Sequence, residues 1–105
     1  VTHKIGVPQA IVQAYINLGE VEKRKGTWDL AKSYFYEATE IAEDAGANQQ
    51  LAVAYRNIGE VYVEMKDFEL GREFCQKAIE LFEQLKSGSE VKKIKAILQA
   101  LPSLN

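Results

Sequence analysis

The 105-residue chain has few of the residues from which catalytic and metal sites are built. It contains one cysteine, Cys75, and one histidine, His3. A single cysteine excludes an internal disulfide and is typical of a reducing compartment, so we expect a cytoplasmic protein. The sequence shows no phosphate-binding loop, paired-carboxylate constellation or cysteine–histidine pair. It therefore predicts neither an enzyme nor a bound cofactor or metal, and Cys75 is expected to be an inert buried thiol.

Charge and hydropathy argue against two further kinds of partner. The net charge is −2, whereas nucleic-acid binding requires a concentrated positive surface. No apolar run approaches the roughly 20 residues that cross a bilayer. The only prolines, Pro8 and Pro102, lie near the two ends and leave the interior free to be helical. We expect one domain, residues 1–105, that binds no nucleic acid and no membrane.

The main positive signal is an internal repeat of forty residues. When residues 6–45 are aligned with residues 46–85, twelve of the forty positions are identical. The identical pairs are Gly6/Gly46, Gln9/Gln49, Ala14/Ala54, Tyr15/Tyr55, Asn17/Asn57, Gly19/Gly59, Glu20/Glu60, Val21/Val61, Leu30/Leu70, Ala38/Ala78, Glu40/Glu80 and Glu43/Glu83. A period between about twenty and fifty residues is typical of solenoids.

Within each unit the apolar residues recur at helical spacing. In the first helix the expected core stripe consists of Ile11, Ala14, Tyr15, Leu18 and Val21. Thr27 and Asp67 follow short breaks and are expected to cap the second helix of each unit. The pattern predicts an all-α fold with four helices at about 8–25, 28–45, 48–65 and 68–86.

A fifth amphipathic helix is predicted at about 89–101, ended by Pro102 and capped at its start by Ser87 with Glu90, or by Ser89 alone. We expect it to cap the stack after repeat 1 (8–45) and repeat 2 (48–86). Gly19 and Gly59 lie inside predicted helices, where glycine costs ~1 kcal/mol relative to alanine. Their matched positions predict close packing against a neighbouring helix.

Two strings carry a family resemblance, YINLGEV…KGTWDLAKSYFYEATEI and YRNIGEVYVEMKDFELGREFCQKAIEL. They resemble the tetratricopeptide repeat over about residues 8–86. The period exceeds the common length of about thirty-four and resembles that of the long-helix subgroup. The sequence departs from the family at Glu22, which takes a usual aromatic place, and at Lys66, which takes a usual glycine turn. The resemblance implies a right-handed α-α superhelix that serves as a protein–protein interaction scaffold.

The resemblance also implies that the first helix of each unit lines a concave groove for a protein or an extended peptide. The expected peptide-binding residues are Gln13, Asn17, Glu20, Arg24, Arg56, Asn57 and Glu60. The same projection places Ile16, Val53 and Glu64 in the groove, with Lys93 and Ile97 extending it.

Asn17 and Asn57 are the sharpest candidates in this groove. A ladder of asparagine amides can donate to and accept from a peptide backbone without reading its sequence. The alternative interpretation, two surface residues shared through duplication, stays open. Glu20 and Glu60 either attract a basic segment or remain solvated acids. Lys23, with its basic neighbours, is interpreted as part of a solvated helix end.

An alternative function is self-association through the N-terminal end of the solenoid. Residues 1–6 align with residues 41–46, so we expect the chain to begin at the tail of a preceding hairpin. Apolar groups near Ile5, Val7, Ile11 and Val12 are then expected to be partly exposed, while the fifth helix covers the opposite end. Such an end favours a homodimer or a stacked oligomer.

Overall fold

The computed structural model describes residues 7–102, so His3, Ile5, Gly6 and the aligned segment 1–6 lie outside the described part. All five predicted helices are present, and no strand occurs among the described residues. The helices are α1 (Val7–Lys25), α2 (Trp28–Ala45), α3 (Asn48–Glu64), α4 (Phe68–Gln84) and α5 (Gly88–Ala100). The predicted all-α class is confirmed.

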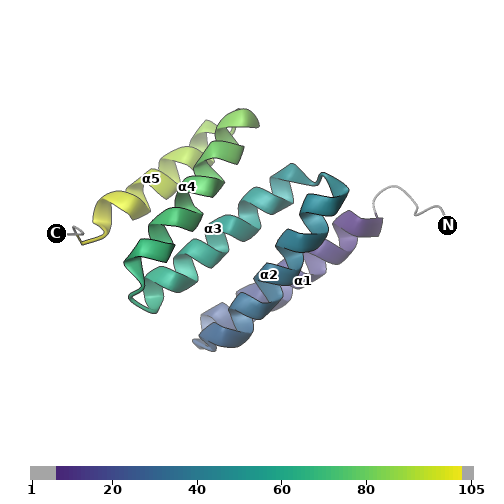
Figure 1. The fold of residues 1–105 in the computed structure, drawn as a ribbon, viewed down its shortest axis with the longest axis horizontal. Helices are drawn as coiled ribbons and strands as arrows, with labels where there is room; N and C mark the ends of the chain where they lie inside the picture. The colour runs from purple at the N-terminus through teal and green to yellow at the C-terminus, as the bar shows by residue number, and fades with distance from the viewer. Residues whose placement is uncertain (1–6, 103–105) are drawn as a thin grey trace.

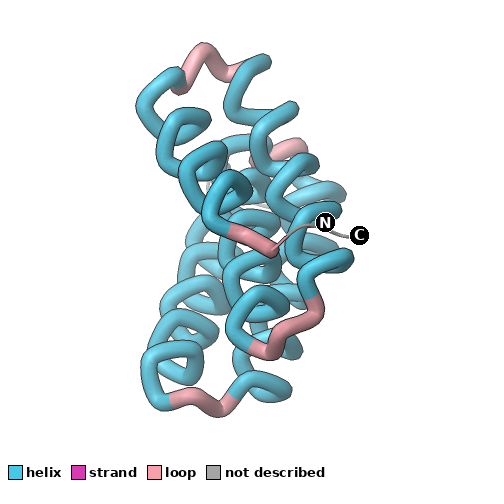
Figure 2. The backbone as a smooth tube through the Cα atoms, turned by 90° about the vertical axis from the view of Figure 1, so that its left-hand side faces the viewer, coloured by secondary structure: helices cyan, strands magenta, loops and turns pink. Residues whose placement is uncertain are grey.

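Consecutive helices pack as antiparallel neighbours joined by short turns (Figures 1 and 2). In Figure 1, α2 lies in front of α1 and α4 in front of α5, with α3 between the two pairs. The array measures 52 × 31 × 19 Å, and α1 and α5 lie at its opposite ends. The architecture is therefore an all-α helical repeat solenoid.

The first four helices end in one recurring backbone motif. Each end carries a residue with positive φ, at Gly26, Gly46, Lys66 and Lys86. The amide after it donates to the carbonyl five residues earlier, as Thr27 N does to Glu22 O at 3.0 Å. This pairing satisfies carbonyls that a helix end leaves free and turns the chain back on itself.

The hydrogen bonds that cap the helix starts are less uniform than those at the helix ends. Asp67 caps α4 as predicted, accepting the amide of Leu70 at 3.3 Å. Thr27 precedes α2, but its side chain makes no capping hydrogen bond, so that expectation is wrong. Ser87 takes the N-cap position of α5, where its hydroxyl makes no capping bond either. Only its carbonyl accepts the amides of Glu90 and Val91.

Gly19 and Gly59 each lie against the second helix of their own hairpin, which confirms the packing prediction. A Cβ atom added to Gly19 would lie 2.5 Å from the ring of Phe35. A Cβ atom on Gly59 would lie 2.7 Å from Cys75 Sγ and 3.1 Å from the carbonyl oxygen of Gly71. Neither position has space for a side chain, because contacts this short force neighbouring atoms to move.

The core face of α1 differs from the predicted stripe. α1 buries Val12, Ile16 and Gly19 against the rest of the chain. Most of the predicted stripe faces solvent instead, with Tyr15 half-buried and the exposed members being Ile11, Ala14, Leu18 and Val21. The stripe that repeats it on α3 is buried because α2 covers it. The described residues supply no helix on the outer side of α1.

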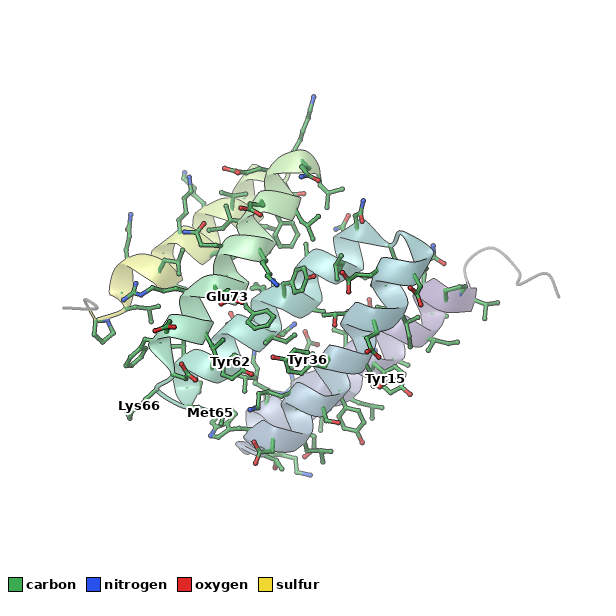
Figure 3. All side chains as sticks on the ribbon, viewed as in Figure 1. Tyr15, Tyr36, Tyr62, Met65, Lys66 and Glu73 are labelled. Atoms are coloured by element: carbon green, nitrogen blue, oxygen red, sulfur yellow. The ribbon has the colours of Figure 1, made fainter. Side chains whose placement is uncertain are left out.

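Aromatic side chains fill the seam between the two hairpins. The hydroxyls of Tyr36 and Tyr62 lie 2.9 Å apart, and Figure 3 shows the two residues side by side. Phe74 stacks on Tyr62 with ring centroids 5.8 Å apart. Burial and the hydrogen bond that joins its hydroxyl to that of Tyr62 raise the pKa of Tyr36 well above its ordinary value. The seam thus makes the two repeats one packed body.

Candidate protein-binding groove

One face of the solenoid is built from α1, α3 and α5, and side-chain bonds join the three helices across it. Gln50 Nε2 donates to the carbonyl of Gln9 at 2.9 Å, which joins α3 to α1. Arg56 Nη1 donates to Glu90 Oε1 at 3.1 Å, which joins α3 to α5. These lateral bonds set the spacing of the helices whose side chains were predicted to line a groove.

A hollow of about 370 Å³ opens near the carboxyl ends of α1 and α3. Its lining residues are Lys23, Trp28, Glu60, Val63, Glu64 and Ile97. Lys23 forms an ion pair with Glu60, and its Nζ also donates to Asn57 Oδ1 at 2.9 Å. An apolar wall beside two carboxylates and one ammonium group suits a long side chain with a polar tip.

Asn57 does not project freely into this hollow. Its side chain is 0% exposed, its Nδ2 donates to the carbonyl of Val53 at 3.0 Å, and its Oδ1 accepts from Lys23. Asn57 is therefore a buried residue, neither an exposed groove contact nor the surface residue of the alternative interpretation. Burial of an amide requires partners, and the chain itself supplies them.

Asn17 is placed differently from its repeat partner. It is exposed on α1, and its Oδ1 accepts a hydrogen bond from Gln13 Nε2 at 3.0 Å. Gln13 is also exposed, and its Oε1 accepts from Gln50. Within the described part of the chain, no hydrogen bond uses the Asn17 amide nitrogen. The duplication produces two unequal asparagines rather than an equivalent pair.

The predicted charged residues fall into paired and unpaired groups. Glu60 pairs with Lys23, and Arg56 pairs with Glu90. In the described part of the chain, no ion pair involves Glu20, which is half-buried, or Arg24, which is exposed. These two ion pairs neutralise the charges of Glu60 and Arg56 on the α1–α3–α5 face.

The remaining groove candidates also divide by burial. Ile16 is buried in the core and cannot reach a ligand, so its assignment to the groove is wrong. Val53 and Ile97 are half-buried, and Glu64 and Lys93 are exposed. Of these four, Ile97 and Glu64 line the hollow.

Lys23, Trp28 and Val63 line the hollow without having been predicted to do so. Lys23 was assigned to a solvated helix end, yet its ammonium group reaches across to α3. The duplication contains no signal for this role, because Val63 stands at the matching position of the second unit. Only the packing of α1 beside α3 brings Lys23 to Asn57 and Glu60.

Cys75 is a free cysteine that lies in the core. Its side chain is 0% exposed, and burial raises the pKa of the thiol to about 11, with a smaller contribution from Glu60. A thiol of this kind is a weak nucleophile at neutral pH. Among residues 7–102, no group of three or more histidine, cysteine, aspartate or glutamate residues is placed to hold a metal ion. In the same range, no helix has the length and apolarity needed to span a bilayer.

The fold defines the class of protein: the chain is an all-α helical repeat solenoid. Comparison with protein families identifies the particular family, since a tetratricopeptide repeat model matches residues 10–84. The chain belongs to the tetratricopeptide repeat family. Members of this family are generally protein–protein interaction modules and non-catalytic scaffolds. None of the curated proteins compared with the chain matches it.

Proposed function

We propose that the chain binds an extended segment of a partner protein along the α1–α3–α5 face. The observation that carries the proposal is the hollow of about 370 Å³, which combines an apolar wall with the carboxylates of Glu60 and Glu64. Lys23 already pairs with Glu60, and no ion pair among residues 7–102 involves Glu64, so Glu64 supplies the negative charge of the hollow. A lysine or arginine side chain of the partner complements this arrangement, with its stem on Trp28 and its cation near Glu64.

Asn17 supplies the second contact of the proposed site. Its exposed amide can pair with a peptide backbone, as the predicted asparagine ladder requires. Asn57 has a supporting role, since its buried amide positions Lys23 at the edge of the hollow. Gln13 and Glu20 extend the same surface toward the start of α1, and Arg24 and Arg56 limit its acidity.

The test begins with selection of peptides from a random library displayed against the purified chain. Selected peptides are expected to be enriched in lysine and arginine. Asn17→Ala should weaken binding of a selected peptide by about 1 kcal/mol or more, which is roughly fivefold in Kd. Glu64→Gln should weaken it by a similar factor, and both effects can be measured by fluorescence anisotropy.

Glu83→Gln is the matched control for Glu64→Gln, because Glu83 is exposed on α4 outside the proposed site. The control should bind the peptide as wild type does. Both site variants should keep the wild-type melting temperature, since Asn17 and Glu64 are exposed. Asn57→Ala is unsuitable as a sole test because it also removes a buried, paired amide. Wild-type affinity in both Asn17→Ala and Glu64→Gln would refute the proposed site.

Self-association through the N-terminal end is the second candidate function. The observation that favours it is a set of large apolar side chains left exposed on α1. Val7 and Ile11 are exposed as expected, whereas Val12 is 0% exposed and belongs to the core. The association surface therefore excludes Val12, and a variant at that position would disturb folding instead.

A further inference from the structure

The exposed apolar residues of α1 form one continuous stripe. Val7, Ile11, Leu18 and Val21 are 40%, 44%, 46% and 43% exposed, and Ala14 between them is also exposed. Their spacing alternates between four and three residues, which keeps them on a single face of the helix. A stripe with this period has the spacing that side-by-side packing against another helix requires.

The second repeat shows what this stripe does when it is covered. The matching residues of α3, Leu51, Ala54, Ile58 and Val61, are between 0% and 7% exposed. They belong to the core cluster in which α2 packs against α3. The same residue types on α1 thus have the character of an interface rather than of a solvated surface.

A second hollow of about 370 Å³ adjoins the stripe where α1 begins and α2 ends. It is lined by Val7, Pro8, Ile11, Ile41, Asp44 and Ala45. Apolar side chains form most of this wall. The stripe and the hollow make one apolar surface at this end of the molecule.

The exposed residues at the two ends of the solenoid differ, and this difference indicates which surface packs on the α1 stripe. The exposed residues of α5 include Lys92, Lys93 and Lys95 together with Ala96 and Ala100, so that helix carries a concentration of positive charge. Head-to-tail stacking would place these lysines against the apolar stripe and desolvate their charges. Pairing two N-terminal ends buries apolar surface against apolar surface. A contact of this kind is isologous and closes as a two-fold dimer.

We infer that the chain forms a two-fold homodimer in which the α1 stripe of one copy packs against the α1 stripe of a second copy in the antiparallel direction. The antiparallel direction follows from charge: Lys25 continues the spacing of the stripe, and parallel pairing would set it against its own copy. Antiparallel pairing brings Val21 of one copy toward Val7 and the hollow of the other. This inference specifies the self-association candidate and does not depend on peptide binding in the groove.

Sedimentation velocity from about 10 µM to about 1 mM tests the pairing, because an interface limited to one helix face is small and its dimer is weak. Ala14 occupies the middle of the stripe, so in a centred pairing the two copies of this residue lie close together. Ala14→Lys and Ala14→Glu should each raise the dimer dissociation constant by about tenfold or more. An equal mixture of the two variants should dimerise more tightly than either alone, because opposite charges then face each other across the axis.

Both variants should fold, since Ala14 is exposed and the new side chains favour helix, and circular dichroism with thermal melting checks this. Leu85→Lys is the matched control, an exposed leucine at the end of α4 that should leave dimerisation unchanged. A wild type that is monomeric at about 1 mM overturns the inference. The inference is equally overturned if Ala14→Lys dimerises with the wild-type dissociation constant, or if the mixture of the two variants dimerises no more tightly than either variant alone. Either result would assign association to another surface. Peptide affinity is measured separately, so a monomeric wild type leaves the groove proposal standing.

Discussion

Lys66 and Lys86 hold the left-handed backbone conformation that Gly26 and Gly46 hold at the matching turns. Their φ angles are 65° and 59°, against 78° and 67° for the two glycines. A side chain in this region brings Cβ close to the following carbonyl oxygen, at a cost of about 1–2 kcal/mol. The hydrogen bonds of the turn stabilise the strained conformation, as when Asp67 N donates to Tyr62 O at 2.9 Å.

Replacing Lys66 with glycine should therefore stabilise the protein. The gain in free energy of unfolding should be about 0.5–1 kcal/mol, because relief of the backbone strain exceeds the greater chain entropy of glycine. Lys95→Gly in the exposed middle of α5 is the matched control and should cost about 1 kcal/mol. Urea denaturation measures both. A loss of stability in Lys66→Gly equal to that of the control would contradict the argument.

Asn17 and Asn57 show that the same residue type at matching repeat positions can have different structural roles. Asn17 and Asn57 are identical by the repeat, yet one is exposed and the other is buried beneath Lys23. The difference arises because α1 covers one side of α3, whereas no described helix covers the matching side of α1. A substitution at Asn57 consequently tests folding and binding together, while a substitution at Asn17 tests binding alone.

The α3–α4 hairpin depends on close approach of two glycines. The carbonyl oxygen of Gly71 and the backbone nitrogen of Cys75 both lie 3.1 Å from the place that a Cβ of Gly59 would occupy. Backbone atoms of a packed helix cannot rotate away as a side chain can. The separation of the two helices is therefore set by the absence of a side chain at this position.

Gly59→Ala should destabilise the chain although alanine is the better helix former. We expect a net loss of about 1–2 kcal/mol, since overpacking outweighs the gain in helix propensity. Gly59→Leu should cost more. Gly88→Ala is the control: a Cβ there meets no atom within 4 Å, and it should be neutral or stabilising. Differential scanning calorimetry of these variants decides the point, and a Gly59→Ala variant that melts above wild type would show that the helices can separate without loss.

Two hydrophobic clusters run through the whole molecule. One joins α1, α2 and α3 and includes Phe74 of α4. The other joins α3, α4 and α5 and includes Val91 and Ile94. The half-buried Val53, Tyr55 and Leu81 pack against both clusters and so link them along the array. The terminal helix α5 is consequently part of the folded unit rather than an appendage.

Ile94→Ala should destabilise the whole molecule by about 2–4 kcal/mol, because Ile94 is 0% exposed although it lies on the last helix. Leu98→Ala, at a half-buried position of the same helix, should cost clearly less. Unfolding followed by circular dichroism should remain a single transition in both variants. A loss below about 1 kcal/mol for Ile94→Ala, or separate melting of α5, would show that α5 does not share the core.

The sequence by itself determined the helices, the turns and the packing glycines of this protein. These features are local or periodic: apolar spacing marks a helix, a glycine marks the end of α1 or α2, the capping Asp67 marks the start of α4, and duplication at matched positions marks Gly19 and Gly59. The family was expected from the resemblance of two residue strings, and the matched range of 10–84 lies within the region of that resemblance. The groove could be assigned to the first helix of each unit only through that resemblance.

Tertiary structure alone decided which side of each helix is covered. Periodicity identifies an apolar stripe but not its neighbour, so Ile11, Leu18 and Val21 resembled core residues although α1 buries Val12 and Ile16 instead. The same reason applies to the site. Lys23 joins it because α1 lies beside α3, and burial of a side chain depends on the helix packed against it, which no pattern within a single helix records.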